Sequence, residues 1–230
     1  MIGGIGMIKS KNNGILIVVS GPSGAGKGTI CSELLKINKN IWLSISMTSR
    51  DPRGTEENGK EYYFVTKEEF EKRISNDEFL EYAVVHNNKY YGTPKDKISD
   101  YLNKGIDVLL EIDIQGALKV KDKVPEALFV FIMPPSMKEL KNRLIKRNTE
   151  TEEKILERFK TAYKEINEYT KYNYVIVNDK VELAVNKLNS IITAEKCRID
   201  RIEEIYLNTK EEKIHENLID KDLINEQIEL

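Results

Sequence analysis

The stretch ILIVVSGPSGAGKGTICSELLKIN, residues 15–38, decides the fold of this chain. Residues 15–20 are aliphatic up to a closing serine and show no polar alternation, which is typical of a strand buried on both faces of a parallel sheet. Glycines follow at positions 21, 24 and 26, and apolar residues then recur at helical spacing over residues 29–38. The stretch therefore predicts a strand, a glycine-rich loop and a helix in direct succession.

The loop fits the phosphate-loop pattern G-x-x-x-x-G-K, although Gly28 stands where Ser or Thr usually follows and the hydroxyl comes one residue later, at Thr29. Glycine lets backbone N–H groups surround an anion, the helix start adds its positive end, and the lysine reaches the outer phosphates. The flanking strand and helix disfavour a chance match in a glycine-rich turn. We predict that a nucleotide's phosphates bind at Gly21, Pro22, Ser23, Gly24, Ala25, Gly26, Lys27, Gly28 and Thr29. Thr29 is also the candidate ligand of Mg²⁺, directly or through water.

Composition and charge exclude several classes of protein. The chain has 230 residues, 40 % hydrophobic and 32 % charged, as expected of one large domain or one core with inserted subdomains. It has no apolar run near the ~18 residues that span a bilayer. No signal pattern follows its start, which is Met1 or Met7, so we expect a cytoplasmic protein that binds no membrane. Two distant cysteines and two histidines favour neither a disulfide framework nor a zinc site, and the charge balance does not indicate nucleic-acid binding.

Strands and helices alternate along most of the chain. Further buried strands are predicted over residues 106–114 and 127–133, with a weaker one over 174–178. Helical patterns cover residues 67–75, 94–103, 136–147, 151–169 and 180 to about 205. We therefore predict an α/β fold, in which helices flank a mostly parallel sheet around the phosphate loop.

Two regions depart from that alternation. Residues 48–93 are rich in Tyr, Arg, Glu, Asn and Gly, which indicates an insertion in which EYYFV, residues 61–65, forms a short antiparallel-type strand. Residues 199–230 carry ten acidic and four basic side chains, and residues 206–230 have scattered Ile and Leu among many acids. This tail is compatible with a solvated amphipathic helix, a disordered end or a partner-binding segment.

Two further groups of charged residues bear on an anionic ligand. Arg50 and Arg53 flank a proline-stiffened turn, so their guanidinium groups can grip a phosphate, with the Tyr62 hydroxyl as a further donor; the alternative is an exposed basic turn. Glu111 and Asp113 alternate with one apolar residue in a predicted buried strand, so both point to one side and need a cation, a base edge or an arginine as partner. An internal salt bridge is the alternative for these two acids.

The order of several motifs resembles the guanylate kinase family from about residue 14 to residue 198. The motifs are GPSGAGKGT, SISMTSRDPR followed by ENGKEYYF, FLEYA followed by YYGTP, EIDIQG, LKNRLIKRNTETEEKILERF and VIVND. The resemblance implies a nucleoside-monophosphate kinase that uses ATP and Mg²⁺ to phosphorylate GMP or dGMP. It implies an N-terminal extension (1–13), a core (14–45, 96–136 and 168–198), a GMP-binding insertion (46–95), a mobile helical lid (137–167) and an acidic C-terminal extension (199–230).

The resemblance also implies roles for individual residues. ATP is expected at the loop residues named above and at Asn178, near the adenine. The residues expected to act in catalysis are Lys27, Arg50, Arg143, Arg147 and Arg158. The residues expected to read guanine are Ser46, Glu81 and Thr93, those for the GMP phosphate are Arg50, Arg53, Tyr62 and Tyr91, and the acidic pair Glu111 and Asp113 completes the GMP site.

The chemistry of guanine agrees with these assignments. Guanine donates from N1 and from its 2-amino group, so the Glu81 carboxylate can accept both bonds while hydroxyls donate to O6. Adenine would leave that carboxylate unpaired, which disfavours AMP as acceptor. We expect direct in-line transfer without a covalent enzyme intermediate, because the chain offers many arginines and one loop lysine but no Ser-His-Asp set.

Three features depart from the family's pattern. In PRGTE, residues 52–56, the glycine is displaced from the usual P-R-x-G-E. The segment before YYGT is one residue longer than usual, so Tyr90 and Tyr91 both remain candidates for the phosphate, and the acidic extension has no counterpart. Two alternatives to an active GMP kinase remain: an inactive guanylate-kinase-like interaction module, disfavoured by the intact loop, and a kinase for another nucleoside monophosphate.

Overall fold

The computed structural model describes residues 7–10, 14–85, 89–146 and 152–206. By their contacts the residues fall into two compact units. The larger unit is residues 14–191, and the smaller one is formed by residues 1–13 together with 192–230. In the described part of the chain, no helix is both long enough and apolar enough to cross a membrane.

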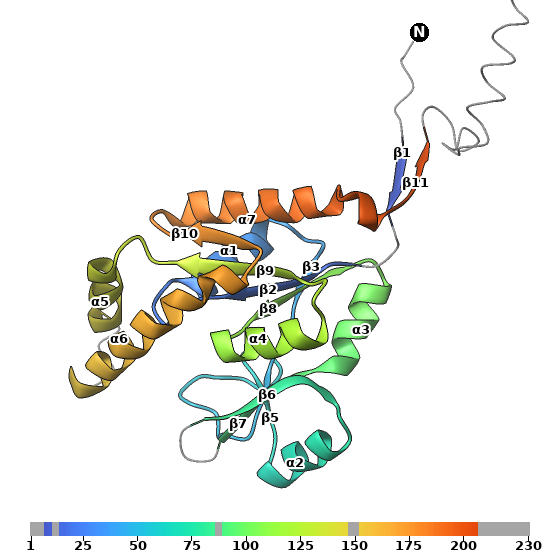
Figure 1. Ribbon diagram of the computed structural model, residues 1–230. Helices are drawn as coiled ribbons and strands as arrows, with labels where there is room; N and C mark the ends of the chain where they lie inside the picture. The colour runs from blue at the N-terminus through green and yellow to red at the C-terminus, as the bar shows by residue number, and fades with distance from the viewer. Residues whose placement is uncertain (1–6, 11–13, 86–88, 147–151, 207–230) are drawn as a thin grey trace, which may run out of the picture. The chain divides into compact units, whose positions relative to one another are not determined.

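A five-stranded parallel sheet forms the centre of the larger unit (Figure 1). Its strands, in spatial order, are β10 (Tyr174–Val177), β9 (Leu128–Met133), β2 (Leu16–Ser20), β8 (Asp107–Glu111) and β3 (Ile41–Leu43). The predicted α/β fold with a mostly parallel sheet is confirmed, and four of the five strands lie where their apolar runs predicted them. The edge strand β3 was missed because three residues are too few to show a pattern.

Helices cover both faces of this sheet. On one face, α3 (Lys95–Asn103) and α4 (Ile114–Lys123) share a cluster of buried residues with Leu16 and Val18 of β2. On the other face, α1 (Lys27–Ile37) buries Ile30 and Leu34 completely. The end of α1 is tied to α7 (Val181–Lys196), which runs along the same face, because the Asn38 amide donates to Asn189 at 3.0 Å (Figure 1). Since successive strand residues face opposite sides, this double cover explains why β2 is apolar throughout.

One predicted boundary needs correction. The sequence predicted a strand over residues 106–114, but β8 ends at Glu111 and α4 begins at Ile114. The Asp113 side chain accepts a hydrogen bond from the Gly116 backbone N–H at 2.7 Å and so caps α4. Aspartate is among the strongest helix N-caps, and this local bond ends the extended segment.

A second sheet lies within residues 47–94 and has the order β5-β4-β7-β6. Its strands are β4 (Met47–Thr48), β5 (Tyr63–Phe64), β6 (Phe79–Val85) and β7 (Lys89–Pro94), and α2 (Lys67–Ser75) follows β5. The prediction that residues 61–65 contain a short strand is confirmed, but its antiparallel character is wrong because β5 pairs with β4 in parallel. The excursion over residues 49–62 returns the chain to the starting end of β4, which makes the parallel pairing possible.

This second sheet has a hydrophobic cluster of its own. Phe70 of α2 is fully buried and stacks on Phe79, with ring centroids 4.3 Å apart, and on Tyr90 at 5.1 Å. Met47 completes the buried part of the cluster. Aromatic stacking of this kind fixes the position of β6 and β7 relative to α2.

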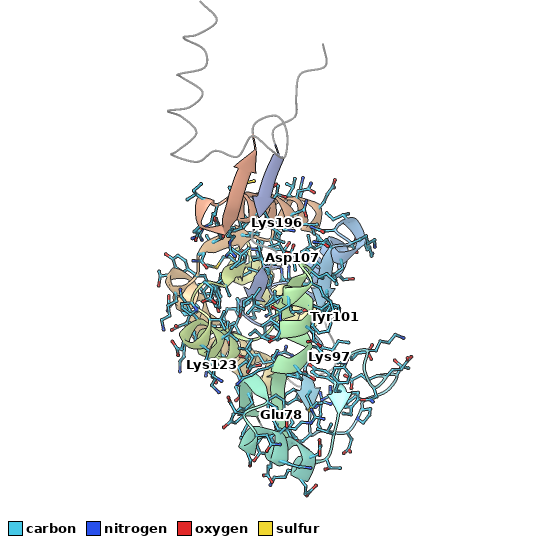
Figure 2. All side chains as sticks on the ribbon, turned by 90° about the vertical axis from the view of Figure 1, so that its right-hand side faces the viewer. Glu78, Lys97, Tyr101, Asp107, Lys123 and Lys196 are labelled. Atoms are coloured by element: carbon cyan, nitrogen blue, oxygen red, sulfur yellow. The ribbon has the colours of Figure 1, made fainter. Side chains whose placement is uncertain are left out.

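Helix α3 joins the two sheets. Figure 2 shows Lys97 and Tyr101 one turn apart along this helix. The Tyr101 ring stacks on Trp42 of β3 at 4.3 Å, which fastens the helix to the central sheet. The Lys97 ammonium donates to the Tyr63 hydroxyl of β5 at 2.5 Å and lies 4.4 Å from the centre of that ring, which fastens it to the second sheet.

Two helices follow β9. The first is α5 (Met137–Lys146) and the second is α6 (Glu152–Ile166), which continues into a short 3₁₀ helix over Asn167–Lys171. They pack against each other through Leu140 and Leu144 on α5 and Ala162 on α6. Both helices lie where their apolar spacing predicted them.

The smaller unit contains a two-stranded antiparallel sheet. β1 (Met7–Ser10) pairs with β11 (Ile202–Tyr206), and a 3₁₀ turn over Ile199–Arg201 precedes β11. The prediction that a helix continues from residue 180 to about 205 is therefore wrong, since α7 ends at Lys196. The partner of β11 lies at the other end of the chain, so no local pattern could show the pairing.

Replacing Phe70 by Ala tests the cluster of the second sheet. Removing a fully buried phenylalanine should lower the free energy of unfolding by about 3–5 kcal/mol, because transfer and cavity terms add. Urea denaturation followed by circular dichroism measures the loss. The control is Val84→Ala, a side chain on β6 that is 53 % exposed, for which we expect a change within about 0.5 kcal/mol. Equal losses of unfolding free energy in the two variants would contradict the role of buried Phe70 in stabilising the second sheet.

Candidate active site

One part of the predicted site residues lies where the parallel strands end. The glycine loop follows β2, Glu111 closes β8, and Asn178 directly follows β10. From β2 the chain passes to β3 and β8 on one side and later to β9 and β10 on the other, as Figure 1 shows. Ligands of open parallel sheets bind at the carboxyl ends of the strands, at such a reversal of strand order.

The glycine loop is held from the end of β10. Gly26 caps α1 in a left-handed conformation with φ 95°, and a Cβ on it would lie 2.4 Å from Nδ2 of Asn178. That amide nitrogen donates to the Ala25 carbonyl at 2.8 Å, and Asn178 is buried. Gly26 has no side chain to cap the helix, so the first N–H groups of α1 point into the loop, where an anion can accept them.

Lys27 lies inside the loop. Its ammonium donates to the Gly21 carbonyl at 2.6 Å and to the Pro22 carbonyl at 3.2 Å. Burial lowers the pKa of Lys27, while the nearby carboxylates of Glu111 and Glu165 act in the opposite direction. A cation held on backbone carbonyls at the turn is in place to meet an outer phosphate.

Helix α5 approaches the loop closely. A Cβ on Gly24, whose φ is 87°, would lie 3.0 Å from Cδ1 of Leu140 and 3.1 Å from Cδ2 of Leu144. These two leucines also hold α5 against α6. The predicted lid helices are therefore packed on the phosphate loop through a position that admits only glycine without rearrangement.

Two of the predicted lid arginines reach the loop. Arg143 donates to the Asn178 carbonyl at 3.1 Å and pairs with Glu139 at 2.9 Å, and its other terminal nitrogen lies 3.5 Å from the Ala25 carbonyl. Arg158 on α6 donates to the Ser23 hydroxyl. The third, Arg147, lies outside the described residues.

A second group of donors is built around Arg50, which follows β4. The Arg50 side chain is 8 % exposed, and its guanidinium forms a bidentate pair with Glu56, at 2.6 and 2.8 Å. Its Nε donates to the Tyr91 hydroxyl at 3.0 Å, and its Cζ lies 5.0 Å from the centre of the Tyr62 ring. The Glu56 bond is the main reason that the pKa of Arg50 is raised above its ordinary value. Arg50, Tyr62 and Tyr91 are thus brought together, as expected.

The structure separates the two tyrosines that the sequence left open. Tyr91 points to Arg50, whereas the Tyr90 ring stacks on Phe70 and its hydroxyl donates to Glu71 at 2.9 Å. Adjacent residues of a strand face opposite sides of the sheet, so only one of them can reach the guanidinium. Arg53 is exposed in the turn beside Arg50.

A buried carboxylate lies on the same sheet. Glu81 of β6 is 7 % exposed and accepts a bond from the Thr93 hydroxyl of β7 at 2.7 Å. Burial raises the pKa of Glu81, and the bond from Thr93 partly offsets this. Its other oxygen lies 3.1 Å from the position of a Cβ on Gly116, next to the start of α4. Ser46 precedes β4 and its carbonyl accepts from the Tyr63 N–H at 2.9 Å.

The expected burial of Glu111 and Asp113 is wrong. Both are exposed, because β8 emerges from the sheet at Glu111 and Asp113 lies beyond its end, where it caps α4. Glu111 is nevertheless close to the loop, since Oε1 lies 3.3 Å from the position of a Cβ on Gly28. Burial lowers the pKa of Lys27 and the charge of Glu111 opposes this, whereas burial raises the pKa of Tyr62 and Glu111 adds to it; Glu111 thus lies within electrostatic range of the loop and of the Arg50 group.

Sequence reasoning missed two carboxylates of the site. Glu56 pairs with Arg50. Its only signal in the sequence is its place as the last residue of the PRGTE motif, residues 52–56. Glu165 of α6 is half-buried near Lys27; burial raises its pKa, while Lys27 and the Ser23 N–H lower it. Its signal in the sequence is a spacing of seven residues from Arg158, which places both on one face of α6.

The arrangement can hold two anions and one polar base. The loop with Lys27 forms one group of cationic and N–H donors, and Arg50 with Tyr91 forms the other. Among the residues that the structure describes, no three His, Cys, Asp or Glu side chains converge in a way that would hold a metal ion by themselves. Thr29 lies exposed in the first turn of α1. It directly follows Gly28, the residue that the Glu111 carboxylate approaches.

The chain is similar in sequence to proteins named guanylate kinase. A sequence model described as guanylate kinase matches residues 13–195. The guanylate kinase of Clostridium tetani is 63 % identical over 207 residues, which cover 90 % of this chain and 99 % of that protein. The guanylate kinase of Caldanaerobacter subterraneus is 57 % identical over 204 residues, covering 89 % and 98 %. The crystal structure of guanylate kinase from Anaplasma phagocytophilum is similar at a TM-score of 0.69 and 36 % identity, over 84 % of this chain and 92 % of that one.

Proposed function

This chain belongs to the guanylate kinase family, and we propose that it transfers the γ-phosphoryl group of ATP to GMP or dGMP, giving ADP and GDP or dGDP. The single observation that carries the choice of acceptor is the buried Glu81 carboxylate with the Thr93 hydroxyl bonded to it. A buried carboxylate is unfavourable unless a ligand or the protein donates to it, and guanine offers two donors on one edge.

ATP binds, in this proposal, along residues 21–29. The backbone N–H groups of the loop and the start of α1 hold its phosphates, and Lys27 leaves the Gly21 and Pro22 carbonyls to meet the outer ones. Asn178 supports the loop through Ala25 and lies on the side where the adenine is expected.

GMP binds to the second sheet. Arg50, Arg53, Tyr62 and Tyr91 hold its phosphate, because guanidinium and phenol donors converge there. Glu81 accepts from guanine N1 and its 2-amino group, and the Ser46 hydroxyl donates to O6. The Thr93 hydroxyl carries one proton, so it donates to O6 only when it leaves Glu81. Asp113, which caps α4, lies beside Glu81 at the start of that helix, and Glu111, the other acid proposed for this site, lies nearer the phosphate loop.

The transfer itself is direct. The GMP phosphate oxygen attacks the γ-phosphorus of ATP in line, the bond to the β-phosphate oxygen breaks, and ADP leaves with the electron pair. Charge spreads over the transferring group, and Lys27, Arg143 and Arg158 are the cations placed to neutralise it, with Arg147 as a further candidate. Closure of the lid on both nucleotides excludes water that would otherwise hydrolyse ATP.

Mg²⁺ is the proposed cofactor, bound together with ATP. The residues at the loop fit this ion, because the Thr29 hydroxyl and the Glu111 carboxylate offer oxygen ligands beside the first turn of α1. Magnesium keeps several waters and binds substrate phosphates, so one or two protein oxygens suffice. The ion supplies neutralisation of phosphate charge when it is bound.

The two alternatives make different predictions for the acceptor. An inactive interaction module would turn over no nucleotide. This alternative is disfavoured by the intact phosphate loop and by relatives named as guanylate kinases at 57–63 % identity. A kinase for another nucleoside monophosphate would prefer AMP, UMP or CMP. A coupled assay of ADP release with GMP, dGMP, AMP, UMP and CMP tests all three, and turnover with GMP no faster than with AMP would overturn the proposal.

Replacing Lys27 by Ala should lower kcat with ATP and GMP about 100- to 1,000-fold while leaving the fold intact, because a preorganised cation is lost from the transferring phosphate. The same coupled assay measures kcat, and circular dichroism checks the fold. Lys36→Ala on the same helix is the control, since that ammonium is exposed and pairs only with Glu33 among the described contacts. A near-normal kcat in Lys27→Ala would remove Lys27 from the mechanism.

Replacing Glu81 by Gln should lower kcat/KM for GMP about 10- to 100-fold and reduce the preference for GMP over AMP, since an amide cannot accept from both guanine donors. The control is Glu68→Gln on α2, an exposed residue of the same insertion. Unchanged selectivity in Glu81→Gln would place the guanine reader elsewhere.

The pH dependence of GMP binding gives a second measurement on the same residue. Because burial raises the pKa of Glu81, the carboxylate takes up a proton at a higher pH than an exposed glutamate. GMP binding needs the ionised form, so its affinity should fall as the pH drops through that raised pKa. Titration calorimetry over a pH series should show this fall in the wild type and not in Glu81→Gln, and an identical fall in both would contradict the assignment.

A further inference from the structure

Glu56 takes one particular edge of the Arg50 guanidinium. A guanidinium presents its N–H donors along an end formed by both terminal nitrogens and along a side formed by Nε and one terminal nitrogen. Glu56 binds the end, with Oε2 at 2.6 Å from one terminal nitrogen and Oε1 at 2.8 Å from the other. The first of these nitrogens also donates to the Asp51 carbonyl at 2.8 Å, so both of its protons are used.

The side edge of Arg50 faces the tyrosines. Nε donates to the Tyr91 hydroxyl at 3.0 Å, and the guanidinium lies over the Tyr62 ring. The second proton of the terminal nitrogen on this edge is not used by Glu56, because each terminal nitrogen carries two. A phosphate that reaches Tyr91 would therefore meet the Nε edge of Arg50 and not the edge that Glu56 holds.

We propose that Glu56 is a positioning residue for the acceptor phosphate: by holding the end of the Arg50 guanidinium, it turns the Nε edge toward Tyr91, where the phosphate of GMP binds. The proposal rests on the proposed function. Glu56 does not itself touch the nucleotide, and its effect reaches the substrate through Arg50.

Glu56 also fixes the turn that carries the second arginine. Its Oε2 accepts from the Arg53 backbone N–H at 2.8 Å, and its own N–H donates to the Arg53 carbonyl at 3.0 Å. One carboxylate thus joins the side chain of Arg50 to the backbone of Arg53. This bond also explains how the turn tolerates a displaced glycine, since Gly54 and Thr55 lie between residues that Glu56 already holds together.

The pair is suited to orient a side chain permanently. The bonds from Arg50 and Arg53 lower the pKa of Glu56 to about 2, so the carboxylate stays ionised throughout the neutral range. The guanidinium also packs against the Tyr62 and Phe64 rings, at 5.0 and 5.6 Å from their centres. Bidentate arginine–carboxylate pairs fix the orientation of the guanidinium as well as its distance from the carboxylate.

The opposite role for Glu56 would be competition with the phosphate for Arg50. A competitor would occupy the edge that the ligand uses, and its removal would tighten GMP binding. Because Glu56 holds the other edge, its removal should weaken GMP binding instead. The two roles therefore predict changes of opposite sign in one measurement.

The test is Glu56→Gln in the full chain, with calorimetric binding of GMP and of guanosine and steady-state kinetics. We expect GMP to bind about 10- to 100-fold more weakly because Arg50 is misplaced, while guanosine, which lacks the phosphate, binds as in the wild type. KM for ATP should stay within about twofold. The matched control is the neighbouring Glu57→Gln, whose carboxylate is exposed and pairs with Lys60.

A double-mutant cycle separates this role from a loss of structure. In an Arg50→Lys background, Glu56→Gln should weaken GMP binding by less than twofold further, because the guanidinium edge that Glu56 orients is gone and the glutamine oxygen can still accept from the Arg53 N–H. If Glu56→Gln does not fold, Glu56→Asp, which keeps the charge but shortens the reach, replaces it and should show the same selective loss of GMP over guanosine.

Several results would overturn the proposal. Unchanged or tighter GMP binding by Glu56→Gln would do so, as would an equal loss of guanosine binding or a full effect in the Arg50→Lys background. If instead the wild type shows no turnover of GMP, the proposed function fails, and the proposal for Glu56 falls with it. A wild type active on GMP with an unaffected Glu56→Gln removes only the role of Glu56.

Discussion

The rest of the structure depends on the turn between β2 and α1, where the middle strand of a buried sheet ends in N–H groups that need an acceptor. The loop backbone is not held by its own residues alone: Asn178 from the end of β10 binds the Ala25 carbonyl, and Arg158 from α6 binds the Ser23 hydroxyl. Each contact comes from a different part of the chain. The loop can therefore present a fixed row of donors, which is the condition for binding a phosphate without reorganisation.

The cations of the site are balanced by carboxylates of the same chain. Arg50 pairs with Glu56, Arg143 pairs with Glu139, and Lys27 lies within electrostatic range of Glu111. Unpaired charges at the burial of Arg50 and Lys27 would be unfavourable, so the protein keeps carboxylates near these two cations before a nucleotide arrives. A partner can leave the cation when the phosphate binds, as the Gly21 carbonyl can leave Lys27, or remain and orient it, as we infer for Glu56.

The parts of this structure that the sequence predicted are those set by local pattern. The apolar run of β2, the glycines and Lys27 identify the loop without any knowledge of the fold. Short elements gave no such signal: β3 has three residues, and β11 is extended because it pairs with β1 at the other end of the chain. The exposure of Glu111 and the cap made by Asp113 depend on where β8 stops. The pair of Glu56 with Arg50 is a contact between side chains that hydrophobic periodicity in the sequence does not predict.

The register of one strand sets both halves of the proposed acceptor site. Tyr91 and Thr93 lie two residues apart on β7, so both face the same side, and Tyr90 faces the aromatic cluster around Phe70. Thr93 pairs with Glu81 across β6, and Tyr91 pairs with Thr48 across β4, two residues before Arg50. A shift of one residue would turn Tyr91 and Thr93 away together and expose the cluster residue Tyr90 to the site. Because the stacking of Phe70 opposes that shift, the small hydrophobic cluster fixes the distance between the proposed base reader and the proposed phosphate donors.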